Sequence, residues 1–130
     1  MNILLIEDSR FLRLSNERAL VKAGFNVITA TDGEEGLRLA RERRPDLVIL
    51  DLMLPKLPGR EVLRELRKDP DTAKMLVMVV SSLPQANDSK LLEEGANSYF
   101  EKSGLLLDRG TETFIQKVRN LLARAKAAGA

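Results

Sequence analysis

Acidic, hydroxyl and amino side chains follow directly after short apolar runs at several places along this 130-residue chain. These side chains belong to Glu7 and Asp8, to Asp51, to Ser81 and Ser82, and to Glu101 and Lys102. When carboxylates gather, each raises the pKa of the others unless a cation joins them. Mg²⁺ is a suitable cation, because it takes one or two carboxylates together with waters and phosphate oxygens. If the fold brings these side chains together, the sequence predicts a magnesium site.

The same side chains could support phosphoryl transfer. Mg²⁺, the ammonium of Lys102 and the hydroxyl of Ser81 can share the charge that develops on a phosphoryl group, while a carboxylate in line acts as nucleophile. The chemistry that fits is formation of an aspartyl phosphate. Taken singly, each residue also has a plainer role: Asp8 or Ser9 as a helix cap, Asp51 as the start of a turn, and Lys102 as a solvated charge.

The hydrophobic pattern predicts the elements that must position these residues. Five runs rich in Ile, Val and Leu begin 20 to 29 residues apart. Each run is continuous rather than alternating, which is typical of strands buried on both faces of a parallel sheet. The predicted strands are Ile3–Ile6, Val27–Ala30, Leu47–Leu50, Leu76–Val80 and Ser98–Phe100.

Each gap between these strands is long enough for one crossover helix. The sequence therefore predicts an α/β fold of (βα)5 type, and right-handed crossovers with helices on both faces give a doubly wound sheet. Such sheets bind ligands beyond the carboxyl ends of their strands, which is where the polar side chains are found.

Capping residues and glycines predict where the helices begin and end. The first helix ends at Gly24. The second opens with Asp32 as N-cap, has Glu35 three residues later as in a capping box, and ends at Arg44 before Pro45. The later helices are predicted to begin at Pro58–Gly59, to cover Asp88–Glu94 before Gly95, and to begin near Thr111 with a buried face of Phe114, Ile115, Val118, Leu121 and Leu122.

The composition excludes several classes of protein. The chain has no Cys and no His, which excludes disulfide scaffolds, thiol catalysis and Ser–His triads. The 21 basic and 19 acidic side chains are interleaved, and a net charge of +2 is too small to indicate nucleic-acid binding. No apolar run approaches the roughly 20 residues of a membrane helix, and the N-terminus lacks the basic region of a signal peptide. We expect one soluble, cytoplasmic domain.

Four segments carry a resemblance to a known family. They are LLIEDS, DLMLPKLPG around Asp51, VVSS ending at Ser82, and YFEK ending at Lys102. Their order, with separations of 43, 30 and 21 residues between Asp8, Asp51, Ser81 and Lys102, resembles the receiver domain of bacterial two-component response regulators. The resemblance covers residues 1–122, and residues 123–130 are interpreted as a helix end or the start of a linker. It implies a flavodoxin-like sheet of strand order 2-1-3-4-5.

The resemblance also implies a phosphoacceptor and its metal ligands. Asp51 would accept a phosphoryl group from a histidine of a partner kinase. Asp8, the carboxylate of Asp51 and the backbone carbonyl of Met53 would hold Mg²⁺, with Glu7 acting mainly through water.

Further roles follow from the same resemblance. Ser81 would hydrogen-bond one phosphoryl oxygen and Lys102 would pair with another. Tyr99 matches the switch aromatic, which turns inward when the hydroxyl of Ser81 moves toward the phosphate; its plainer interpretation is a half-buried strand aromatic. Pro55 and Gly59 match the loop after the phosphoacceptor.

The chain departs from the family at some positions. Ser103 follows Lys102 where many receivers have proline, which leaves the isomer of that peptide bond open. Met53 and Leu83 are apolar where many relatives carry polar side chains, and neither can orient an attacking water by hydrogen bonding. Our hypothesis is that the phosphorylated state is long-lived.

Other function classes are disfavoured. A phosphatase of the haloacid dehalogenase type needs a second acid two residues after its nucleophile, where this chain has Met53. A flavin or nucleotide module needs a first loop rich in Gly, Ser or Thr, whereas EDSR places two carboxylates there. The alternative that stays open is a receiver-like interaction domain that is not phosphorylated.

The predicted protein is a signalling switch rather than an enzyme, with at most self-catalysed phosphotransfer and slow autodephosphorylation. Its signal would leave through the fourth helix, fifth strand and fifth helix, around Lys90, Tyr99 and Lys117. The expected partners are a histidine kinase or phosphotransfer protein and a downstream target or output domain. Membrane and nucleic acid are not expected, and a homodimer could form on phosphorylation. Whether the chain stands alone or is cut from a longer regulator stays open.

Overall fold

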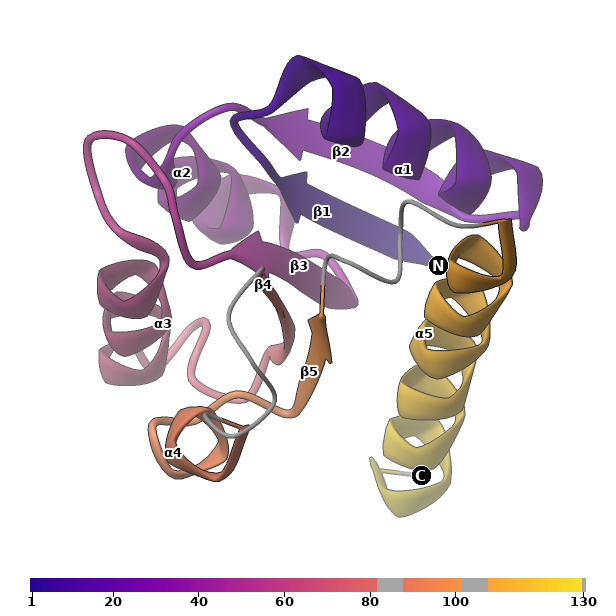
Figure 1. The fold of residues 1–130 in the computed structure, drawn as a ribbon. Coiled ribbons are helices and arrows are strands. Elements are labelled where there is room, and N and C mark those ends of the chain that lie inside the picture. The colour runs from indigo at the N-terminus through magenta and orange to yellow at the C-terminus, as the bar shows by residue number, and fades with distance from the viewer. Residues whose placement is uncertain (82–87, 102–107, 130) are drawn as a thin grey trace.

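The computed structural model describes residues 1–81, 88–101 and 108–129, in which strands and helices alternate along the chain (Figure 1). The strands are β1 (Asn2–Ile6), β2 (Asn26–Ala30), β3 (Leu47–Asp51), β4 (Leu76–Ser81) and β5 (Ser98–Glu101). The helices are α1 (Arg10–Lys22), α2 (Gly33–Arg43), α3 (Gly59–Lys68), α4 (Asp88–Glu93) and α5 (Asp108–Gly129). Each observed strand contains the predicted strand and is one residue longer, at one end. The (βα)5 prediction is confirmed.

All neighbouring strands are parallel, and their order is β2-β1-β3-β4-β5. The expected strand order is therefore confirmed. Ile6 of β1 pairs with Ala30 on one side and with Leu50 on the other. The strand order thus runs from β1 to β2 on one side and from β1 to β3, β4 and β5 on the other. In such sheets the ligand crevice lies where the order changes direction, which is between β1 and β3 here.

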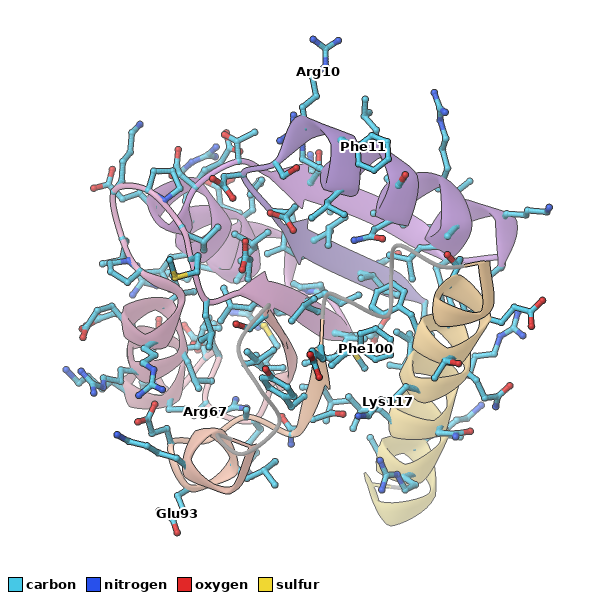
Figure 2. The ribbon with its side chains drawn as sticks, viewed as in Figure 1. Arg10, Phe11, Arg67, Glu93, Phe100 and Lys117 are labelled. Carbon is cyan, nitrogen blue, oxygen red and sulfur yellow. The ribbon has the colours of Figure 1, made fainter. Side chains whose placement is uncertain are left out.

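Helices cover both faces of the sheet, with α2 and α3 on one side and α1 and α5 on the other (Figure 1). Buried side chains of the strands alternate between two hydrophobic clusters, as the two-residue period of a strand requires. In β5, Tyr99 belongs to the cluster with α2 and α3, and Phe100 to the cluster with α1 and α5. Phe100 packs edge-on against Phe114 with ring centroids 5.4 Å apart, and Lys117 Nζ lies 5.8 Å from the Phe100 ring centre (Figure 2).

The predicted cap of α2 is present. Asp32 Oδ1 accepts a hydrogen bond of 2.8 Å from the backbone N–H of Glu35, while Glu35 Oε1 accepts one of 2.9 Å from the N–H of Thr31. The helix ends at Arg43, one residue earlier than predicted, because Arg44 is left-handed with φ of 46°. Positive φ values of 101° at Gly24 and 115° at Gly95 follow α1 and α4, as the two predicted stops require.

The prediction for the start of α5 was wrong. The helix begins at Asp108 rather than near Thr111, because glycine at position 110 costs little in a first turn, where backbone N–H groups have no partner in the helix. At its other end α5 continues to Gly129, so residues 123–129 are helical. Within the described ranges, no helix is long and apolar enough to cross a membrane.

Candidate functional site

Glu7 and Asp8 follow β1 at the start of the loop that leads to α1. The backbone N–H of Glu7 donates to the carbonyl of Ala30 at 3.0 Å, which continues the pairing with β2 by one residue. The Glu7 side chain is buried, and its Oε2 accepts a hydrogen bond of 3.2 Å from the N–H of Ser9. Asp8 is exposed. Ser9 caps α1, since its side chain accepts from the N–H of Leu12. The plainer role of Ser9 as a helix cap is thus confirmed.

Asp51 is the last residue of β3 and is only 2% exposed. Its Oδ1 accepts a hydrogen bond of 3.1 Å from the backbone N–H of Met53. The next residue, Leu52, is still tied to the sheet, because its N–H donates to the carbonyl of Val80 at 3.4 Å. The Asp51 carboxylate is therefore held at the sheet edge by both β3 and the turn that follows it.

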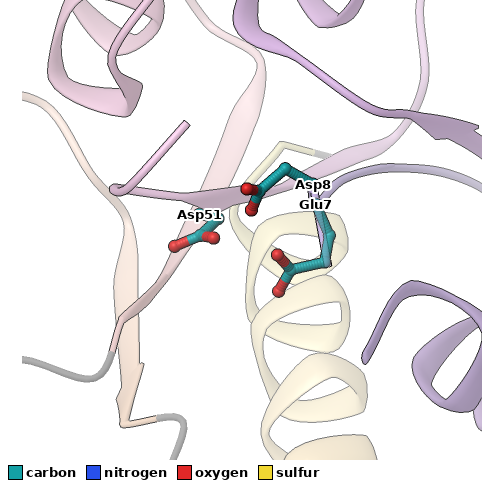
Figure 3. Close-up of side chains that lie close together, drawn as sticks. All are labelled: Glu7, Asp8 and Asp51. Carbon is teal, nitrogen blue, oxygen red and sulfur yellow. The ribbon is translucent and has the colours of Figure 1, made fainter. Parts of the chain in front are cut away.

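The three carboxylates come together as the sequence predicts. One carboxylate oxygen each from Glu7, Asp8 and Asp51 lies within 4.8 Å of the others, at the carboxyl ends of β1 and β3 (Figure 3), and we call this cluster the acidic pocket. Two of the three side chains are buried, which strengthens their mutual repulsion, and the third, Asp8, is exposed. An all-oxygen donor set of this charge fits a hard divalent cation such as Mg²⁺.

Met53 follows Asp51 by two residues and contacts it through the backbone. Its N–H is hydrogen-bonded to Asp51, while its side chain is 66% exposed.

Ser81 and Tyr99 lie on the two strands beyond β3. Asp51 pairs with Val80, so Ser81 stands one residue further along the neighbouring strand, and its side chain is fully buried. Tyr99 is 3% exposed, and its backbone carbonyl accepts a hydrogen bond from Lys117. The ring is therefore buried rather than half-buried.

Some predicted positions fall in the part of the chain that the structure leaves undescribed. These are Ser82, Leu83, Lys102 and Ser103, so the isomer of the Lys102–Ser103 bond and the position of the predicted ammonium lie outside the described residues. Lys102 directly follows Glu101, which pairs with Ser81.

One cation that the sequence analysis did not single out lies beside the acidic loop. Arg13 Nη1 donates to the backbone carbonyls of Glu7, at 3.1 Å, and Asp8, at 3.3 Å. In the sequence, only its position five residues after Asp8 could have indicated these contacts. Contacts of a long side chain with backbone carbonyls produce no hydrophobic pattern.

A second charged contact joins the loops at the ends of β2 and β3. Lys56 Nζ lies 3.5 Å from Asp32 Oδ2. The hydrogen bond from the backbone N–H of Glu35, assisted by Lys56, holds the pKa of Asp32 below its usual value. The Asp32 carboxylate thus caps α2 with one oxygen and pairs with Lys56 through the other.

Comparison with known proteins decides the family. The family described as the response regulator receiver domain matches residues 3–118. The chain belongs to this family. The receiver domain is 40% identical over 110 residues to the transcriptional regulatory protein AfsQ1 of Streptomyces coelicolor, which covers 82% of this chain and 48% of the relative. It is 36% identical over 126 residues to the response regulator MprA of Mycobacterium leprae, covering 97% of the chain and 53% of the relative. The chain thus spans about half the length of these curated relatives.

Solved structures support the same assignment. The receiver domain resembles a response regulator receiver domain protein from Clostridium thermocellum with a TM-score of 0.83 and 29% identity, and 98% of each chain is covered. The fold and the family of this chain are thereby established, and the predicted resemblance is confirmed.

Proposed function

We propose that this receiver domain is a phosphoacceptor switch, in which Asp51 takes a phosphoryl group from a phosphohistidine of a kinase or phosphotransfer protein. The observation that carries the proposal is the buried carboxylate of Asp51 within 4.8 Å of those of Glu7 and Asp8. In the transfer a carboxylate oxygen of Asp51 would bond to phosphorus as the P–N bond breaks, and the histidine ring, protonated on its other nitrogen, would leave as a neutral imidazole.

The acidic pocket would hold Mg²⁺. Asp8, the carboxylate of Asp51 and the backbone carbonyl of Met53 are the proposed ligands, with Glu7 acting through water. The ion supplies positive charge that neutralises the phosphoryl oxygens. The protein's own contribution is to hold the buried Asp51 carboxylate in place through a hydrogen bond from the backbone N–H of Met53.

Ser81 and Lys102 are proposed to read the phosphoryl group, one by a hydroxyl hydrogen bond and the other by its ammonium. The burial of Ser81 next to the strand of Asp51 supports this role. Movement of Ser81 would be transmitted to Tyr99 and then to a surface formed by α4, β5 and α5. The contacts of Ser81 and Lys102 with the phosphoryl group would have to differ between the two states, because a ligand shifts a two-state equilibrium only through such differences.

The proposed partners are a histidine kinase or phosphotransfer protein and a downstream target or output domain, and the proposed location is the cytoplasm. AfsQ1 is named as a transcriptional regulator, and this chain spans 48% of it. An output domain or target for this receiver is proposed by analogy, as is a homodimer formed on phosphorylation. The domain itself would catalyse only its own phosphorylation and slow dephosphorylation.

Intact mass after incubation with acetyl phosphate tests the proposal. We expect a gain of one phosphoryl group that requires Mg²⁺ and is lost in Asp51→Asn. The matched control is Asp71→Asn, which changes an exposed aspartate that faces Arg44 and should leave the mass gain intact. A wild-type protein that gains no phosphoryl group under any condition would instead support an interaction domain without phosphorylation.

The switch residues need a separate test. Ser81→Ala and Lys102→Ala should abolish the phosphorylation-dependent change in the α4–β5–α5 surface, followed by amide exchange, while leaving the far-ultraviolet circular dichroism unchanged. A Lys102→Ala protein that is unfolded, or one that still switches normally, contradicts the assignment.

A further inference from the structure

Arg13 reaches back from α1 to the loop that carries Glu7 and Asp8. Its backbone closes the first turn of the helix, with its N–H donating to the carbonyl of Ser9 at 2.8 Å. Side chains on a helix lean toward its N-terminus, which directs this half-buried guanidinium at the end of β1. A single nitrogen, Nη1, then donates to the carbonyls of both acidic residues, at 3.1 and 3.3 Å.

The loop is held firmly at Glu7 and less firmly at Asp8. Glu7 is fixed by its N–H bond to Ala30 and by the bond from Ser9 to its carboxylate. Asp8 is exposed, and among the described residues no hydrogen bond holds its carboxylate. The direction of the Asp8 side chain therefore depends on its backbone, and the backbone carbonyl of Asp8 is held by Arg13.

We propose that Arg13 is a positioning residue for the cation site, acting through these two carbonyls to aim the carboxylate of Asp8 into the pocket. The inference rests on the proposed function, because it assumes that the pocket binds Mg²⁺. Partners that orient metal ligands from outside the coordination shell commonly change metal affinity by about 10- to 100-fold when they are removed.

The sign of the effect separates positioning from simple charge. A guanidinium near the pocket repels a cation, so a purely electrostatic role predicts that removing Arg13 tightens Mg²⁺ binding. A positioning role predicts that removing Arg13 weakens Mg²⁺ binding. Because one nitrogen makes both contacts, the single ammonium of lysine can replace it, whereas alanine cannot.

The matched control is Arg10→Ala. Arg10 is the first residue of α1 and lies close to Asp8 in the chain, but its side chain is exposed and points away from the sheet (Figure 2). The substitution removes the same charge from the same turn of helix without touching the loop carbonyls.

The experiment measures Mg²⁺ affinity of the wild type, Arg13→Ala, Arg13→Lys and Arg10→Ala by calorimetric titration with MgCl₂. We expect Arg13→Ala to bind about tenfold more weakly, Arg13→Lys to recover most of the affinity, and Arg10→Ala to bind as tightly as wild type or slightly tighter. If Arg13→Ala is too unstable for titration, the rise in its melting temperature with MgCl₂ gives the same affinity, since only the folded state has the site.

Phosphorylation with acetyl phosphate gives a second readout. The Mg²⁺ concentration for half-maximal rate should increase in Arg13→Ala while the rate at saturating Mg²⁺ stays near that of wild type. Equal or tighter Mg²⁺ binding in Arg13→Ala overturns the inference, as does an Arg13→Lys variant as weak as the alanine variant. If the wild type itself fails to bind Mg²⁺, both the inference and the proposed function are overturned, which distinguishes that failure from the first two.

Discussion

A Cβ atom added to Gly59 would lie 2.2 Å from the backbone carbonyl oxygen of Asp51 and 2.6 Å from the Cα of Leu52. The first residue of α3 is therefore in direct contact with the main chain that carries the Asp51 carboxylate. The N–H of Gly59 also donates to the carbonyl of Leu52 at 3.0 Å. The start of α3 and the end of β3 thus move together, and only a residue without a side chain fits between them.

Gly59→Ala should lower the stability of the fold and the Mg²⁺ affinity of the acidic pocket. The added methyl group must push α3 away from β3, and such overpacking typically costs about 1 to 3 kcal/mol of unfolding free energy. We expect lower urea resistance together with weaker Mg²⁺ binding, measured by denaturation and titration.

Gly24→Ala is the control for this substitution. Nothing lies within 4 Å of a Cβ at Gly24, but its φ of 101° is strained for alanine. This variant should lose about 1 kcal/mol of stability and keep its Mg²⁺ affinity. Equal loss of Mg²⁺ binding in both variants would mean that general destabilisation, not contact with Asp51, controls the pocket.

Met53→Asn should shorten the life of the phosphorylated state. Met53 is 66% exposed and stands two residues after Asp51, and an amide at this position can orient a water where a thioether cannot. We expect a severalfold faster loss of phosphate, below the roughly 10²-fold effect of a true general base, because an amide does not accept the proton. Phosphate release after removal of the phosphodonor measures this rate.

The control is Val21→Asn, which puts the same amide at an exposed position near the far end of α1. Val21→Asn should not change the rate of phosphate release. Rapid release already in the wild type would contradict the hypothesis of a long-lived phosphorylated state.

Arg67→Lys should destabilise the fold. Arg67 is half-buried, and its three nitrogens donate to the carbonyls of Ala73, Met75 and Gly95 and to the side chain of Asn97, at 2.6 to 3.0 Å. Burial lowers the pKa of Arg67, but a guanidinium stays charged at any ordinary pH. One ammonium cannot serve acceptors on both sides of the planar group, so we expect a loss of about 2 to 3 kcal/mol in urea denaturation.

Arg64→Lys, one turn earlier on α3, is the comparison. Its ion pair with Glu61 is solvent-exposed, so its loss should cost at most about 1 kcal/mol. Equal effects of the two substitutions would show that the contacts of Arg67 contribute no more than a surface charge.

Lowering the pH should remove the contribution of the ionised Asp32 carboxylate to the stability of the fold. Hydrogen bonding to the N–H of Glu35 lowers the pKa of Asp32 in the folded state. A lowered pKa stabilises the folded state above the unfolded pKa of about 3.9, and this contribution is lost as the pH falls through the folded value. The stability advantage of wild type over Asp32→Asn should therefore shrink below about pH 4 in urea midpoints.

Asp32→Ala separates titration from capping. Alanine loses the cap as well as the charge, so this variant should be less stable than Asp32→Asn by about 1 kcal/mol at every pH. An advantage of wild type over Asp32→Asn that grows as the pH falls would have the wrong sign for a lowered pKa.

The strands were predictable because each is buried on both faces and therefore appears as an unbroken apolar run. Leu47–Leu50 is the clearest case, and β3 exceeds it by one residue only. Helix ends were less predictable, because they depend on backbone geometry. Asp108 begins α5 three residues before the predicted start near Thr111, and Arg44 adopts a left-handed conformation that its residue type does not favour.

The acidic pocket was predictable because parallel strands place their carboxyl ends at one edge of the sheet. Knowing that Glu7 directly follows one strand and that Asp51 stands at the end of another was enough to bring them together. Arg13 and Arg67 were not predictable in the same way. Their nitrogens bind backbone carbonyls, which every residue possesses, so nothing in the sequence identifies the partner.

The pairing of Ile6 with Leu50 also determines when the pocket can form. All three carboxylates lie in the first 51 residues, but they meet only after β2 has moved to the outer side of β1 and β3 has paired with the other side. That pairing closes a long loop, which makes it a slow step of folding. On the proposed function, cation binding during refolding would therefore report assembly of the centre of the sheet. A chain in which only the helices and the β1–β2 pair have formed would lack the site.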